Sequence, residues 1–85
     1  MARAKFRVQS ITRSEGWQKD ENGKLKELQT IKLSPVSAGS DPNHENAKFW
    51  AATPSGQVEL GTVNADAAKV FEIGKEYYID FTPAN

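Results

Sequence analysis

Polar and apolar side chains alternate along residues 76–82, EYYIDFT. Tyr77, Ile79 and Phe81 fall on one side of an extended chain, and Tyr78 and Asp80 fall on the other. Because successive side chains of a strand point to opposite faces, a period of two residues indicates a β-strand with one buried face. The segment therefore predicts a strand that places Tyr77 in the core and Tyr78 on the outer face with Asp80.

A second alternation begins near the N-terminus, in residues 5–13, KFRVQSITR. Phe6 and Val8 lie on one side of the expected strand, whereas Ile11 falls out of phase with them. An extra residue in one strand restores such a phase, because a β-bulge shifts the following side chains to the other face. The pattern predicts a strand with a bulge near Ser10.

Residues 14–24 are polar and hold Asn22-Gly23, a pair that favours the positive φ of a tight turn. Residues 25–36 alternate again and reach Pro35, which ends a strand or marks a sheet edge. These features predict a hairpin with residues 14–24 at its tip and residues 25–36 as its return strand.

Turn-forming residues dominate 37–46, which predicts a loop. Two short strands are expected after it, at 48–53 and 57–63, joined by the turn Thr53-Pro54-Ser55-Gly56. Proline presets φ at the second position of this turn, and glycine supplies a left-handed residue at its end. We therefore expect a second hairpin here.

One helix is expected, over residues 64–74. Asn64 is a favourable N-cap, Asp66 lies near the positive end of the helix dipole, and Gly74 suits the C′ position. A helix of this length is not stable alone in water and has to pack on the sheet.

The expected order of elements is β-β-β-β-α-β, within a single small domain of 85 residues. Short strands joined by hairpins predict a mainly β chain with one short helix. The architecture is then a small, strongly bent sheet or a partly closed barrel, either OB-like or SH3-like, because closure removes exposed edges.

The residue types argue against catalysis and against metal binding. The chain has no cysteine, and its only histidine, His44, lies in a polar loop with no zinc-like spacing around it. A serine nucleophile needs a positioned base, and no elbow motif surrounds any serine. We expect neither an enzyme, a cofactor nor a bound metal, and His44 is interpreted as a surface residue. No apolar run is long enough to span a bilayer, so a cytoplasmic location is expected.

Charge is balanced in total and unequal along the chain. The sequence has eleven Lys and Arg residues and eleven Asp and Glu residues, which gives a formal net charge of zero. By direct count, residues 1–32 hold eight basic and four acidic side chains, and residues 33–85 hold three and seven. A neutral total argues against a general phosphate-coating protein, while a basic face remains open.

The aromatic residues leave two interpretations open. Trp17 lies among polar residues beside Arg13 and Lys19, so its indole either stacks on a base or folds back over the core. Phe49 and Trp50 are neighbours on an expected strand and would face opposite sides. The outward member of that pair is either a ligand platform or a contact with another chain.

Three stretches resemble small uncharacterised proteins of tailed bacteriophages: KLSPVSAGS, FWAATPSGQVEL and FEIGKEYYIDFTPA. The resemblance runs from about Lys5 to Ala84. It implies a phage origin and a place in the cytoplasm of the bacterial host, or in the virion, and it carries no known functional residue.

Three functions are compatible with these observations. The first is binding of a nucleotide or of single-stranded nucleic acid, either to sequester a nucleotide signal of host immunity or to coat single strands. The second is inhibition of a host protein by docking on it, and the third is a virion accessory or assembly role. The protein is expected to form a homo-oligomer.

For the first function, aromatic rings stack on the base, basic groups bind phosphate, and hydroxyls donate hydrogen bonds. The corresponding candidates are Trp17, Trp50, Arg7, Arg13, Lys48, Thr53 and Ser55.

Overall fold

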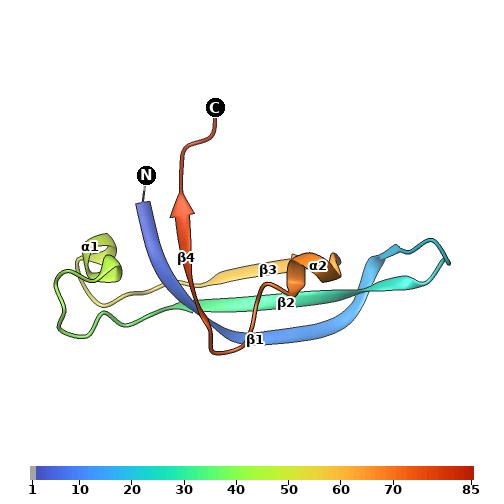
Figure 1. Ribbon diagram of the computed structural model, residues 1–85, viewed down its shortest axis with the longest axis horizontal. Coiled ribbons are helices and arrows are strands. Elements are labelled where there is room, and N and C mark those ends of the chain that lie inside the picture. Colours follow the sequence, from blue (N-terminus) through green and yellow to red (C-terminus); the bar gives the residue numbers. More distant parts are fainter. Residues whose placement is uncertain (1) are drawn as a thin grey trace.

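The computed structural model describes residues 2–85, which form one four-stranded antiparallel sheet and two short helices (Figure 1). The strands are β1 (Ala2–Lys19), β2 (Leu25–Pro35), β3 (Val58–Thr62) and β4 (Glu76–Phe81), and the helices are α1 (Glu45–Trp50) and α2 (Ala65–Ala68). The strand order is β3-β2-β1-β4, so β3 and β4 are the two edges. The prediction of a mainly β chain is confirmed. The sequence left a bent sheet and a partly closed barrel as alternatives, and the structure has the bent, open sheet.

Residues 48–53 do not form the expected strand, and that prediction is wrong. The first half of this segment, residues 48–50, belongs to α1, whose C-cap is Ala51, a residue with φ of 57° whose N–H donates to Ala47 O. The His44 side chain accepts a hydrogen bond from the Asn46 N–H and thereby caps the helix. The Thr53-Pro54-Ser55-Gly56 segment therefore connects a helix to β3 and is not a hairpin turn.

The bulge expected near Ser10 is confirmed. Pairing between β1 and β2 shifts between Val8 and Ser10, which leaves Gln9 without a partner opposite it. Val8 pairs with Leu33, and Ile11 pairs with Ile31 after the shift. The bulge thus returns Ile11 to the same face as Val8.

The first hairpin is longer than the sequence predicts. β1 continues to Lys19 and the turn closes over 20–24, where the Asp20 carboxylate accepts hydrogen bonds from the backbone N–H groups of Asn22 and Lys24. β3 pairs with β2 only from Gln29 to Leu33, and β4 pairs with β1 only up to Arg7. Residues 13–28 therefore form a two-stranded ribbon, here called the arm, which projects away from α1 (Figure 1).

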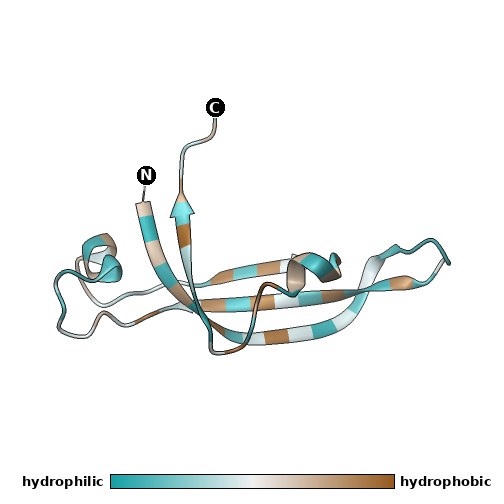
Figure 2. Cartoon of the chain, in the orientation of Figure 1, coloured by the Kyte–Doolittle hydropathy of each residue, from teal (hydrophilic) through white to brown (hydrophobic). Residues whose placement is uncertain are grey.

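The core lies on one face of the sheet, here called the inner face. Its fully buried members are Ala4, Phe6, Val8, Ile31 and Leu33. Tyr77 packs against them as expected, while Tyr78 lies on the opposite face and is 50% exposed. Apolar bands recur along each strand in Figure 2, as the alternating sequence requires.

Helix α2 is shorter than predicted. The Asn64 side chain caps it as expected, with Oδ1 accepting the backbone N–H groups of Asp66 and Ala67. The Tyr77 hydroxyl donates to Val70 O and accepts from Glu72 N, so it holds the chain after α2 in a non-helical path. Gly74 has a φ of 88° but lies in the turn that enters β4, and it does not close the helix.

Candidate functional site

The structure places the residues proposed from the sequence in three parts of the molecule. Trp17 and Arg13 lie on the arm, and Arg7 lies on β1 opposite Glu76. The remaining candidates belong to α1 and the segment that follows it: Lys48, Trp50, Thr53 and Ser55. Since α1 and the arm lie at opposite ends of a chain that extends 53 Å, the candidates do not line one common pocket (Figure 1).

Trp17 is the most exposed large apolar side chain of residues 2–85, at 71%. The strand register explains its position. Glu15 pairs with Glu27 and Lys19 pairs with Leu25, so three residues of β1 lie opposite one of β2. Trp17 is the middle of these three residues. Its exposure excludes the alternative in which the indole covers the core.

The base of the arm is fixed by close packing at Gly16. A Cβ at this position would lie 2.6 Å from the Lys26 carbonyl oxygen and 2.8 Å from Val63 Cγ1. The absence of a side chain therefore lets the segment between β3 and α2 approach the ribbon. A shallow hollow lies beside this contact, lined in part by Gln18, Lys26 and Asn64.

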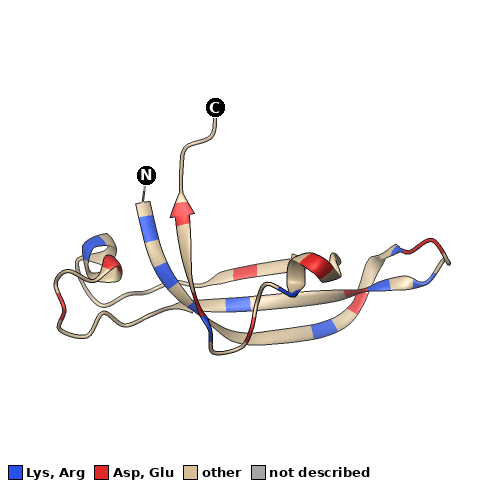
Figure 3. Ribbon diagram, in the orientation of Figure 1, with Lys and Arg blue, Asp and Glu red and all other residues tan. Residues whose placement is uncertain are grey.

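The arm carries charges of both signs (Figure 3). Arg13 Nε donates to Glu27 Oε1 at 3.0 Å, and both side chains are exposed to water. Direct counting over residues 13–28 gives four basic and four acidic side chains. An exposed pair such as Arg13 and Glu27 contributes little to stability, because water screens it.

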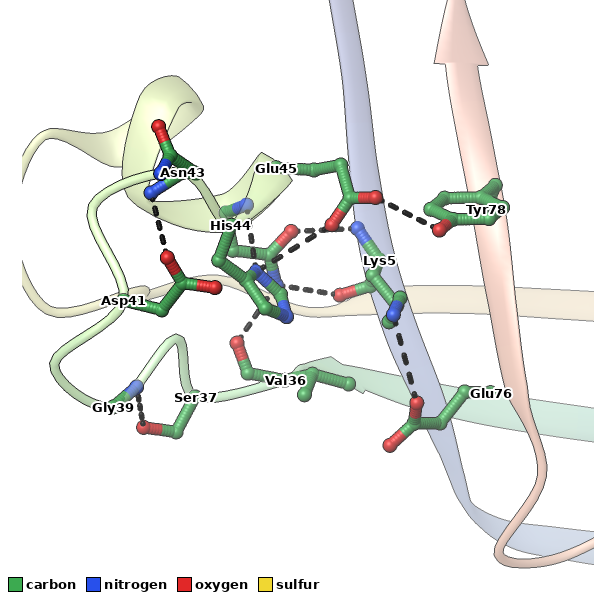
Figure 4. Close-up of polar contacts among 11 residues, drawn as sticks. Lys5, Val36, Ser37, Gly39, Asp41, Asn43, His44, Glu45, Glu76 and Tyr78 are labelled. Atoms are coloured by element: carbon green, nitrogen blue, oxygen red, sulfur yellow. Dashed lines mark hydrogen bonds and ion pairs between the residues drawn. The ribbon is translucent and has the colours of Figure 1, made fainter.

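At the other end of the molecule, Asn46 holds α1 against the sheet. Its side chain is fully buried. Oδ1 accepts the Lys5 N–H at 2.7 Å, and Nδ2 donates to Lys5 O at 2.8 Å and to Val36 O at 2.7 Å. Asn46 thus occupies the place of a neighbouring strand where β2 has ended and β1 continues (Figure 4).

The outer face at this end is bound together by charged groups around Tyr78. Arg3 donates two hydrogen bonds to Asp80, at 2.6 and 3.1 Å, and its guanidinium lies 4.8 Å from the centre of the Tyr78 ring. Lys5 Nζ lies 5.3 Å from the same ring. The Tyr78 hydroxyl donates to Glu45 Oε1 at 2.8 Å, as Figure 4 shows. The ring therefore links β4, β1 and α1.

These contacts shift the proton affinities of three groups. The hydrogen bond from Arg3 lowers the pKa of Asp80, and the same bond raises the pKa of Arg3. The hydrogen bond from Tyr78 lowers the pKa of Glu45. In each case the charged form gains a partner, which is the physical cause of the shift.

The aromatic pair at positions 49 and 50 lies on a helix, so the expectation of opposite strand faces is wrong. Trp50 packs edge-on against Phe6, with ring centres 6.0 Å apart, and its indole N–H donates to the backbone carbonyl of Ser55 at 2.9 Å. Phe49 is 46% exposed and stacks on Phe81. Trp50 is therefore occupied within the molecule, and Trp17 is left as the free aromatic candidate.

His44 has a structural role that its loop position concealed. Its Nδ1 accepts the Asn46 N–H at 3.1 Å, so it is a helix cap. Residues 2–85 hold no group of three or more His, Asp or Glu side chains placed to share a metal ion. Over the same residues, neither helix has the length or apolar character needed to cross a membrane.

Several residues at the α1 end were missed by sequence reasoning, namely Arg3, Lys5, Glu45, Asn46 and Tyr78 as an interacting set. A signal for part of this set was present. Arg3, Lys5 and Arg7 continue the alternation of β1, and Tyr78 belongs to the same face of β4. Asn46 gave no such signal, because it stands in a run of turn-forming residues.

Comparison of the chain with protein-family models, with curated proteins and with solved structures finds no match.

Proposed function

We propose that this chain is a non-enzymatic binding protein whose arm contacts a nucleotide or a single strand of nucleic acid through Trp17. The exposure of the Trp17 indole on a projecting ribbon is the observation that carries the proposal. A tryptophan so placed makes little contribution to its own fold and offers a large π surface to another molecule.

Stacking supplies the energy of such a contact. A base stacked on an aromatic side chain contributes about 1–3 kcal/mol to the binding free energy. The contribution does not depend strongly on which base is stacked, because every base has a π face. Arg13, Lys19 and Lys26 lie on the same ribbon and provide the cations that phosphate requires. The Arg13–Glu27 pair is exposed, so a phosphate competes for Arg13 without first breaking a buried ion pair.

The biological setting is part of the same proposal. The resemblance to small tailed-phage proteins supports a phage origin and action in the cytoplasm of the bacterial host. In that setting the protein sequesters a nucleotide signal of host immunity or coats single strands. The equal numbers of basic and acidic groups on the arm favour a short ligand over a long polyanion.

One observation favours a second function, docking on a host protein. The charges of the arm balance, and an exposed tryptophan amid mixed charges is typical of the central contact of a protein interface. The two functions differ in their dependence on salt, since contacts with phosphate weaken as salt rises.

The test is binding measured by native mass spectrometry and by anisotropy of a labelled single-stranded oligonucleotide, with signalling nucleotides as competitors. Trp17→Ala is expected to weaken binding at least about tenfold, which corresponds to the loss of one stacked base. Trp17→Phe retains a ring and is expected to restore most of the affinity.

Leu25→Ala is the matched control, because Leu25 is also exposed on the arm, at 38%, but has no π surface. Equal affinity of Trp17→Ala and the unmodified protein would contradict the proposal, as would an unmodified protein that binds none of these ligands. Loss of affinity in Leu25→Ala of the same size would indicate a hydrophobic contact and favour the host-protein function.

A further inference from the structure

We infer that the inner face of the sheet is an interface for a second copy of this chain. The inference is independent of the arm and of Trp17, since it concerns the face that bears the core. It rests on three observations: how little of that face is covered, how much surface the chain exposes, and which side chains the face presents.

The inner face is only partly covered. A stable domain needs two packed layers around its core, and here the second layer consists of helices of six and four residues and of the segment after α2, whose Phe71 packs on the core. Leu60 pairs with Ile31 and Phe81 pairs with Ala2, so both lie on this face, yet they are 44% and 49% exposed. Ile79 and Val58, also on this face, are only partly buried.

The exposed area supports the same conclusion. The chain exposes 6164 Å², whereas a compact monomer of 9.4 kDa exposes about 5,000 Å². The excess of roughly 1,200 Å² is somewhat larger than the ~800 Å² that each partner buries in a standard interface. The radius of gyration, 15.8 Å, likewise exceeds the ~12 Å of a compact domain of this length.

The arm accounts for part of this excess, but its surface is mostly polar. Part of the exposed apolar surface lies on the inner face, at Leu60 and at Phe81, on which Phe49 stacks. Without a cysteine the chain has no disulfide to compensate for its small core. Association is a general means by which such small cores are completed.

The chemistry of the face identifies the partner. Strand pairing places only uncharged side chains on the inner face of β1 from Ala2 to Ile11, and likewise on β3 and β4. The cations and carboxylates of these strands meet on the outer face instead, as in the Lys32–Glu59 pair. The first cation along this face is Arg13, at the start of the arm, and it is paired with Glu27, so a polyanion finds no cation on the inner face between Ala2 and Ile11.

A second copy presents the same uncharged apolar surface, so a two-fold arrangement buries both faces without burying a charge. The net charge of zero adds no repulsion between two copies. The occupant that fits best is thus another molecule of this protein.

The test is analytical ultracentrifugation and native mass spectrometry of the whole chain over a range of concentrations. The unmodified protein is expected to have twice the mass of 9.4 kDa, and Leu60→Glu is expected to raise the dimer dissociation constant at least about tenfold. Leu25→Glu is the matched control, because Leu25 has a similar exposure but lies on the arm. It is expected to leave the dimer intact.

Circular dichroism of each variant checks that it folds, and Phe81→Ser repeats the test at the other edge of the sheet if Leu60→Glu does not fold. A monomeric unmodified protein at every concentration would overturn the inference and leave the inner face to a different partner. A dimer that Leu60→Glu and Phe81→Ser leave intact would overturn it too. Neither result bears on Trp17, so the arm proposal is judged separately.

Discussion

The α1 end and the arm contain similar residues but use them in different ways. At the α1 end, Trp50 donates a hydrogen bond and packs on the core, and Arg3 is paired with Asp80 and with the Tyr78 ring. On the arm, Trp17 is exposed, and Arg13 has a single exposed carboxylate as its partner. Each end thus combines a tryptophan with an arginine, and only one of the two sets is part of the packed structure.

The difference shows that residue type alone does not separate a ligand contact from a structural contact. The α1 end sits where β2 has ended, so backbone groups of β1 need new partners, and the side chains there provide them. In the arm the strands pair with each other, and the side-chain contacts are between exposed groups, such as Arg13 with Glu27. The comparison therefore assigns a structural role to the side chains of the α1 end, and it is consistent with the recognition role proposed above for the arm.

The largest expected effect is at Asn46. Asn46→Ala removes three hydrogen bonds and leaves Lys5 N–H and Val36 O without their partner, whereas Lys5 O keeps the hydrogen bond from Val36 N–H. We expect a loss of roughly 3 kcal/mol in the free energy of unfolding, because buried backbone groups without partners cost about 1–3 kcal/mol each. Urea denaturation measures the loss.

Asn43→Ala is the matched control, an exposed asparagine of the preceding loop, and it is expected to change stability by less than about 0.5 kcal/mol. If Asn46→Ala and Asn43→Ala had the same stability, α1 would not be held by Asn46, and the contrast between the two ends would fail.

The two tryptophans test the contrast directly. Trp50→Ala is expected to cost roughly 2–3 kcal/mol, somewhat less than a fully buried tryptophan, because it packs against Phe6 and binds the Ser55 carbonyl. Trp17→Ala is expected to cost less than about 0.5 kcal/mol, as for other exposed positions. Thermal unfolding of both variants measures the difference. A cost at position 17 equal to that at position 50 would place Trp17 in the structural set.

A smaller effect is expected at the base of the arm. Gly16→Ala places a Cβ 2.6 Å from a backbone oxygen, so the ribbon must move away from Val63, at a cost of roughly 1–2 kcal/mol. Amide chemical shifts of residues 13–28 are expected to change with it. In Gly61→Ala the new Cβ meets only Leu28 Cδ1 at 3.5 Å, an ordinary contact. If both variants left stability and shifts unchanged, the arm would not be anchored at Gly16.

The sequence predicted the elements that depend on local patterns. The alternation of residues 76–82, the bulge near Ser10 and the Asn64 cap all appear in the structure, because each is determined by neighbouring residues. Helix α1 was missed, because its first turn depends on a histidine cap and on contacts between Asn46 and the distant Lys5. A six-residue helix gives too short a pattern to reveal such contacts.

The candidate site residues divide in the same way, into those that neighbouring residues identify and those that depend on contacts between distant parts of the chain. The exposed aromatic of the arm was identified from its polar surroundings, and the exposure of Trp17 agrees with one of the two interpretations given to it. Trp50, Thr53 and Ser55 were selected on the assumption of a hairpin. In the structure Trp50 packs on the core, whereas Thr53 and Ser55 lie in the exposed segment after α1, where the Ser55 carbonyl accepts the Trp50 indole N–H. Pairing between β1 and β4 was needed to bring Arg3 and Tyr78 together.

The smallest expected effect is on the pH dependence of stability, which is expected to arise from carboxylates at the α1 end and not from the arm. The pKa values of Asp80 and Glu45 are both lowered in the folded chain, from ordinary values of 3.8 and 4.5. Their contribution to stability is therefore fully present above those ordinary values and is lost as the pH falls through the lower, folded pKa values. We expect the urea midpoint to decline below about pH 4 for this reason.

The double variant Asp80→Asn, Glu45→Gln removes both carboxylates and is expected to lower the midpoint slightly near neutral pH and to flatten its decline in acid. Because Asp80 is exposed and Glu45 is partly exposed, solvent screening keeps the change small. Glu21→Gln, at the turn of the arm, is the control and is expected to leave the acid decline unchanged. If the double variant declined as steeply as the unmodified protein, the carboxylates responsible would lie elsewhere, and the charged contacts around Tyr78 would not distinguish the α1 end from the arm.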